Sequence, residues 1–133
     1  MFELGLRASF EAAHSLRGDF GPAQRLHGHT YRVDVAVRGP RIDQHGVLLD
    51  LGTLQAATSE VVGPLQMQNL DTLPETSNFN TTVEAMAQYV HREIAARLGA
   101  RPEIALRITI WESDLVWASY EHDLSADAHA REP

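Results

Sequence analysis

Apolar and polar residues alternate in four segments of this chain, which is the period of a strand with one buried face. The predicted strands are residues 2–10, 30–38, 104–111 and 115–120, and a shorter strand is predicted at 47–49. The alternation breaks after Phe10, where we expect the first strand to end. The tight connection 112–114 predicts that the last two strands form a hairpin.

Two further segments place apolar residues at helical spacing. The first covers residues 51–65 and follows Asp50, a residue type that favours the cap position before a helix. The second covers residues 83–98, and Asn80 or Thr81 is its expected N-cap. Its predicted buried stripe consists of Val83, Met86, Ala87, Val90, Ile94 and Leu98.

The predicted order is strand, strand, helix, helix, strand, strand. Antiparallel strands with two helices on one face form an α+β sandwich, so we expect a single domain over residues 1–124. Residues 125–133 are small and polar, and we expect this tail to be frayed. A sheet of this kind has open edges, which favour strand pairing between subunits and therefore a homo-oligomer.

Composition limits the classes of partner. The 133 residues have a net charge of −7 and only 11 basic residues, which argues against nucleic-acid binding because phosphate contacts need a basic face. No apolar run approaches the roughly 18 residues of a membrane span, and the first residues lack the profile of a signal peptide. The chain has no cysteine and hence no disulfide framework, which fits a cytoplasmic protein.

The main chemical signal is His27-Gly28-His29, which leads into the second predicted strand. Alternate side chains of an extended backbone point to one face, so the two imidazoles project together. His14 follows the first predicted strand and supplies a third imidazole. Three neutral imidazoles with an open fourth position are typical of a catalytic zinc site, whereas structural sites usually have four ligands that include cysteine. The alternative is that these histidines serve only the fold.

Six short stretches occur in the order and spacing of one enzyme family. They are residues 10–14 (FEAAH), 26–31 (LHGHTY), 46–51 (GVLLDL), 69–74 (NLDTLP), 80–84 (NTTVE), and Trp111-Glu112 ahead of 117–120 (WASY). Over about residues 2–122 the chain resembles the 6-pyruvoyltetrahydropterin synthase and 6-carboxytetrahydropterin synthase family. The resemblance implies the tunnelling fold, a pterin substrate such as dihydroneopterin triphosphate, and trimers that stack into hexamers with active sites at subunit boundaries.

The resemblance also implies a zinc site with three imidazole ligands, His14, His27 and His29. Glu112 matches the carboxylate that accepts hydrogen bonds from the guanidine-like edge of the pterin, a role that suits a carboxylate in need of donors. Without the family, a turn residue facing solvent would be the simpler interpretation of Glu112. Thr81 and Thr82 match positions that line the pterin pocket, with helix capping as the alternative.

The chain departs from the family where protons are moved. The family uses a cysteine in the loop before the paired histidines, together with an aspartate–histidine pair from another loop. Ala23 stands at the cysteine position of the bacterial enzymes, and Gln66 and Met67 stand at the aspartate and histidine positions. Alanine and methionine take up no proton, and a glutamine amide is not a base at neutral pH. The loss of all three predicts altered chemistry.

Three functions therefore remain open. The first is a zinc-dependent lyase that acts on a pterin and takes its base from water on the metal or from a substitute side chain. The substitutes considered are Asp71, His45 and Asp114. The second function is binding of a pterin-like ligand without conversion. The third is an assembly partner whose zinc site is vestigial or structural. The three ligands and the ring-binding carboxylate favour the first two.

Overall fold

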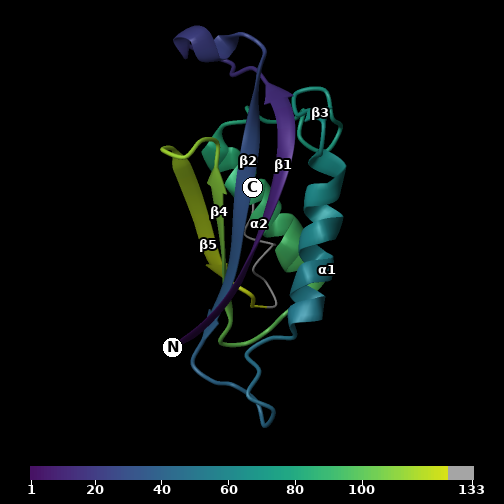
Figure 1. The fold of residues 1–133 in the computed structure, drawn as a ribbon, viewed down its shortest axis with the longest axis vertical. Coiled ribbons are helices and arrows are strands. Elements are labelled where there is room, and N and C mark those ends of the chain that lie inside the picture. Colours follow the sequence, from purple (N-terminus) through teal and green to yellow (C-terminus); the bar gives the residue numbers. More distant parts are fainter. Residues whose placement is uncertain (126–133) are drawn as a thin grey trace.

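A five-stranded sheet forms the centre of the computed structural model, which describes residues 1–125 (Figure 1). The strands are β1 (Phe2–His14), β2 (His27–Gly39), β3 (Gln68–Asn69), β4 (Ala105–Trp111) and β5 (Trp117–Asp123). They lie in the order β3-β1-β2-β4-β5. The pairs β1–β2, β2–β4 and β4–β5 are antiparallel, whereas the short β3 runs parallel to β1. All but the first residue of the tail predicted to be frayed lies outside the described residues.

Two helices cover one face of this sheet (Figure 1). They are α1 (Leu51–Val62) and α2 (Val83–Leu98), and two short 3-10 turns, η1 (Gly21–Gln24) and η2 (Gly63–Leu65), lie in the connections. The α+β class, the single helical layer and the order of the main elements are therefore confirmed, whereas the two-residue strand β3 between the helices was not predicted. Within residues 1–125, no helix is both long and apolar enough to cross a membrane.

The core lies between the sheet and the helices because alternate strand residues point toward them. The side chains that β2 and β4 bury completely or almost so are Tyr31, Val33, Val35, Val37, Leu106, Ile108 and Ile110. The predicted stripe of α2 faces the core, with Val83 only partly buried at its start. Each large apolar side chain buried in this way stabilises the fold by about 1.5–3 kcal/mol.

Both strands that hold the histidines are longer than predicted. β1 continues to His14 instead of ending at Phe10, and the alternation of burial continues through Ala12. β2 begins at His27 rather than at Thr30. The reason is long-range: pairing between the two strands extends to the last residue of β1 and the first of β2, and one segment alone does not show this.

Three other predicted boundaries are wrong. Residues 47–49 form a loop and not a strand, since the Asp43 carboxylate accepts hydrogen bonds from the backbone N–H groups of His45 and Val47 and closes the chain into a turn. The last strand begins at Trp117, two residues late, because residues 112–116 form the hairpin loop. α1 ends at Val62, and η2 follows it.

The N-terminal cap of α2 is also displaced from its predicted position. Thr82, rather than Asn80 or Thr81, is the N-cap, and its side chain accepts a hydrogen bond from the backbone N–H of Ala85 (3.2 Å). Asp50 caps α1 as predicted, accepting from the backbone N–H of Thr53 (2.9 Å). Because Thr82 satisfies the end of α2, the hydroxyl of Thr81 is available for another contact.

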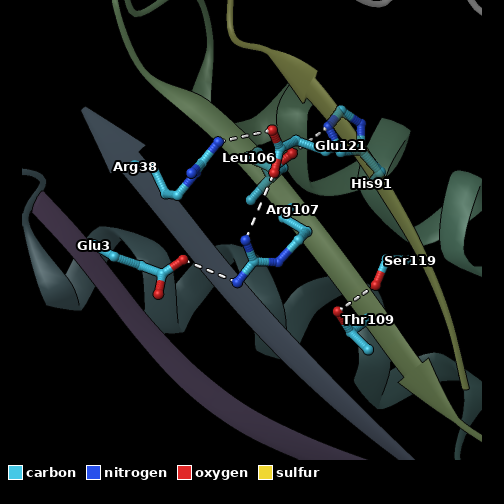
Figure 2. Close-up of polar contacts among 8 residues, drawn as sticks. All are labelled: Glu3, Arg38, His91, Leu106, Arg107, Thr109, Ser119 and Glu121. Atoms are coloured by element: carbon cyan, nitrogen blue, oxygen red, sulfur yellow. Dashed lines mark hydrogen bonds and ion pairs between the residues drawn. The ribbon is translucent and has the colours of Figure 1, made fainter. Parts of the chain in front are cut away.

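The face of the sheet opposite the helices is polar. Arg107 of β4 binds Glu3 of β1 (2.9 Å) and Glu121 of β5 (3.7 Å), as Figure 2 shows. Glu121 also accepts a hydrogen bond from Arg38 of β2. The register partner of Arg107 is Ala36, whose small side chain leaves room for the arginine to reach across β2. Exposed pairs of this kind each contribute only about 0–1 kcal/mol, but together they keep this face hydrated.

We expect Thr82→Ala to destabilise the metal-free protein by about 1 kcal/mol, because the substitution removes the cap of α2. Urea unfolding of the purified protein measures the change. Thr82→Ser keeps a hydroxyl at the same position and should remain close to the parent protein. Equal stability of all three proteins would contradict the assignment of Thr82 as the cap.

Candidate functional site

Strand register brings the three predicted metal ligands together. His14 ends β1, His27 begins β2, and the antiparallel ladder places the two directly opposite each other. His29 pairs with Ala12, two residues before His14, and so lies on the diagonal of the same ladder. Directly opposed and diagonal residues on one face of a sheet are within side-chain reach. All three imidazoles therefore share the face that carries the buried Tyr31.

The three rings form a compact triangle. Their centroids are 4.6 Å apart for His14–His27, 5.2 Å for His14–His29 and 4.9 Å for His27–His29. One potential ligand atom from each residue lies within 4.8 Å of the other two. This spacing suits a single ion bound by three imidazole nitrogens after small side-chain rotations.

Backbone carbonyls fix the protonation of two of these rings. Nδ1 of His14 lies 2.9 Å from the carbonyl oxygen of Thr81, and Nδ1 of His27 lies 2.7 Å from that of Arg25. A carbonyl oxygen only accepts, so in each neutral ring Nδ1 carries the proton and Nε2 presents its lone pair. The residues thus fit a metal ion, since imidazole binds metals through an unprotonated nitrogen.

Burial keeps two of the imidazoles neutral. Desolvation lowers the pKa of His14 below its ordinary value of 6.5, and the neighbouring His27 and His29 act in the same direction, whereas the Thr81 carbonyl and Asp71 oppose the shift. Desolvation likewise lowers the pKa of His29, against the opposing charge of Glu112. Neutral imidazole is the form that binds a metal ion, so the metal-free site is poised for binding at neutral pH.

Tyr31 places a hydroxyl group beside the histidines, a feature that the sequence analysis did not predict. Its side chain is completely buried, and its hydroxyl oxygen lies 3.4 Å from Nε2 of His14. Desolvation, with the nearby charges of Glu112 and Asp71, raises the pKa of this phenol well above its ordinary value. Alternation alone identified Tyr31 only as a core residue, because periodicity does not show what the end of a side chain meets.

Glu112 lies at the same end of the sheet as the histidines. One carboxylate oxygen is 4.0 Å from Nε2 of His29, and the side chain is 27% exposed. Its backbone N–H donates to the carbonyl of Val116 across the hairpin loop, which holds the residue in place. The carboxylate is thus accessible to a ligand that also reaches the three imidazoles.

The two threonines differ in their surroundings. Thr81 is completely buried, and its hydroxyl donates to a carboxylate oxygen of Asp71 (2.8 Å). Thr82 caps α2, so the capping alternative is confirmed for Thr82 and not for Thr81. A role for either residue in holding a pterin remains a prediction.

The positions of the missing proton-transfer set hold side chains that serve the fold or face outward. Ala23 belongs to η1. Gln66 accepts a hydrogen bond from the backbone N–H of Glu11 (2.9 Å). Met67 is 73% exposed and adopts a positive φ of 59°, and its own N–H donates to the carbonyl of Glu11.

Only one of the three substitute bases lies next to a metal ligand. His45 lies in the turn that Asp43 closes after the end of β2, at the other end of the β1–β2 ribbon, which is roughly 40 Å long for 13 residues. Asp114 is exposed in the hairpin loop. Asp71, in the loop between β3 and α2, binds Thr81 and Ser15, which are the partner and the chain neighbour of His14.

The family model described as 6-pyruvoyl tetrahydropterin synthase matches residues 3–123. The chain belongs to this family. The 6-pyruvoyl tetrahydrobiopterin synthase of Drosophila melanogaster is 30% identical over 128 residues, covering 86% of this chain and 76% of the relative. The 6-carboxy-5,6,7,8-tetrahydropterin synthase of Haemophilus influenzae is 24% identical over 144 residues, covering 91% of this chain and 99% of the relative.

The fold of this member of the 6-pyruvoyl tetrahydropterin synthase family agrees with a solved structure. The 6-pyruvoyl tetrahydropterin synthase of Caenorhabditis elegans superposes with a TM-score of 0.82 at 24% sequence identity, covering 92% of this chain and 96% of the other. The match confirms the tunnelling fold expected from the motifs. The family model and the curated relatives, which are named as pterin synthases, support a lyase of the pterin synthase type.

We expect His27→Ala to weaken the binding of Zn²⁺ by at least about 100-fold, since losing a residue that only orients a ligand already costs about 10- to 100-fold. Competition with a chromophoric chelator measures the affinity. His45→Ala removes an imidazole at the other end of the ribbon and should bind like the parent protein. If His27→Ala retained full affinity, the ligand assignment would be wrong.

We expect the metal-free protein to lose stability as the pH falls from about 7 to about 5. The unfolded chain takes up protons on His14 and His29 near their ordinary pKa, whereas the folded chain does so at lower pH. The unfolded state then binds more protons, so the free energy of unfolding decreases. Urea unfolding at several pH values measures the free energy of unfolding. It should fall less steeply with decreasing pH for His14→Gln/His29→Gln than for the parent protein, and an equally steep fall in both would contradict this expectation.

Proposed function

We propose that this protein is a zinc-dependent lyase of the pterin synthase type, acting on dihydroneopterin triphosphate or a related pterin with altered proton-transfer chemistry. The observation that carries the proposal is the convergence of three imidazoles beside an accessible carboxylate, with 4.0 Å between Glu112 and His29. Curated relatives named as pterin synthases support the substrate class.

Each group at the site has a distinct task. His14, His27 and His29 would hold the ion, which when bound supplies a Lewis acid that polarises a substrate oxygen. Glu112 accepts hydrogen bonds from the N–H groups of the ring and fixes its orientation, and an ionised acceptor makes these bonds stronger than neutral ones. The ring edge and the reacting side chain of a pterin are then both held within one short site.

Proton transfer must differ from that of relatives that use a cysteine, aspartate and histidine set. Ala23 and Met67 have no ionisable group, and the amide of Gln66 is bonded to the backbone of Glu11. These three positions favour a second candidate function, in which the protein holds a pterin-like ligand without converting it. The two functions share the metal ligands and Glu112 and differ only in turnover.

The same proposal includes a cytoplasmic homo-oligomer, a trimer stacked to a hexamer. β5 forms one edge of the sheet, and β3 covers only two residues of β1 at the other. An edge strand is where a strand of another copy of the chain can add by pairing, which favours an oligomer. Relatives of the resembled family assemble in this way, with sites at the subunit boundaries.

Incubation of zinc-loaded protein with dihydroneopterin triphosphate, with product followed by mass spectrometry, tests the proposed function. We expect turnover that is abolished by a chelator and restored by Zn²⁺, because the ion polarises the substrate. Glu112→Gln should weaken ligand binding by about 10- to 100-fold, since a hydrogen bond to a charged group is worth about 1.5–3 kcal/mol.

Glu121→Gln is the matched control, because it changes a carboxylate on the polar face that is paired with Arg38. This variant should bind ligand and turn it over like the parent protein. Tight binding of the pterin with no product would overturn the lyase and establish the second function. Turnover that persists without metal would overturn zinc dependence.

A further inference from the structure

We propose that Asp71, acting through the hydroxyl of Thr81, is a positioning residue for the metal ligand His14. The inference rests on the proposed metal site, but it does not depend on turnover. Neither residue is expected to touch the ion. Their task is to hold the imidazole so that Nε2, and not Nδ1, faces the other two histidines.

A short hydrogen-bond chain links the three residues. Nδ1 of His14 lies 2.9 Å from the carbonyl oxygen and 3.2 Å from the hydroxyl oxygen of Thr81. The Thr81 hydroxyl donates its proton to Oδ1 of Asp71 (2.8 Å). With its proton committed to the carboxylate, this hydroxyl can only accept from the imidazole, so Asp71 adds to the effect of the Thr81 carbonyl in favouring the tautomer in which Nδ1 carries the proton.

The same carboxylate also fixes the backbone beside the ligand. Oδ2 of Asp71 accepts a hydrogen bond from the N–H of Ser15, the residue after His14 (2.6 Å). On the other side, the carbonyl of Ala13 accepts from the N–H of Leu70 (2.9 Å). Two neighbouring loop residues therefore hold the chain on either side of His14, and a ligand held in this way loses little freedom on binding an ion.

This geometry also explains why Asp71 does not stand in for the missing base. One of its oxygens accepts from Thr81 and the other from Ser15, so the carboxylate is occupied by donors of the protein. Its nearest link to the site passes through the completely buried Thr81. A carboxylate that orients a ligating histidine through its other ring nitrogen is a recurrent arrangement around bound metals, here with a hydroxyl between the two.

The affinity for Co²⁺, a spectroscopic substitute for Zn²⁺, tests the proposal. We expect Thr81→Val and Asp71→Asn each to weaken Co²⁺ binding by about 10- to 100-fold and to change the visible spectrum of the bound ion. Thr81→Ser keeps the hydroxyl and should bind within about threefold of the parent protein. Thr81→Val leaves the backbone carbonyl in place, so it removes only the link to Asp71.

Thr76→Val is the matched control, because Thr76 is also a completely buried threonine of this loop, and its hydroxyl bonds to the carbonyl of Leu70. Unfolding of each metal-free variant by urea accounts for any general loss of stability. The proposal is overturned if Thr81→Val binds Co²⁺ like the parent protein, or if Thr76→Val weakens binding as much. If Thr81→Val fails to fold, the Co²⁺ affinity of Asp71→Asn compared with that of Thr76→Val decides in the same way.

The outcome also separates this proposal from the proposed function. A parent protein that binds neither Zn²⁺ nor Co²⁺ overturns the metal site and the role of Asp71 together. A parent protein that binds metal but yields no product overturns the lyase alone. In that second case the affinities of Thr81→Val and Asp71→Asn still decide whether Asp71 positions His14.

Discussion

The pairing of His14 with His27 is the constraint on which the site depends. Side chains on a strand alternate between faces, so a register shift of one residue would turn His27 and His29 toward the polar face and leave His14 on the helix-facing side. The register is set by the buried residues of β2, from Tyr31 to Val37, which pack beneath the helices. The hydrophobic core and the metal site are therefore specified by the same alignment of β1 and β2.

Features within one segment could be predicted from the sequence, and features that join distant segments could not. The alternation of β2, the stripe of α2 and the spacing of His27 and His29 were all visible along the chain. The extension of β1 to His14 required its partner strand. The hydrogen bond from His14 to Thr81 spans 67 residues, and no periodicity in the loop between β3 and α2 predicts it. Resemblance to a family identified Thr81 but not its contact.

The predicted metal ligands and the positions of the missing proton-transfer set lie in different parts of the scaffold. The histidines lie at the ends of paired strands, where displacement of one residue disturbs several cross-strand contacts. Glu112 directly follows β4, in a hairpin loop where its N–H donates to the carbonyl of Val116. Ala23, Gln66 and Met67 lie in connections, which accept different side chains more readily. The three predicted metal ligands are thus held by strand pairing, whereas Ala23, Gln66 and Met67 lie outside the strands.

At Met67, a hydrogen bond of the backbone, and not the side chain, holds the local conformation. The N–H of Met67 donates a hydrogen bond to the carbonyl of Glu11, which fixes the left-handed conformation of Met67. Its side chain extends into solvent. Because the main chain holds the bend, the position accepts unbranched side chains, whereas a β-branched residue is disfavoured at this positive φ. The loop therefore carries its bend in the main chain, and an exposed side chain at this position can differ without disturbing the pairing of β3 with β1.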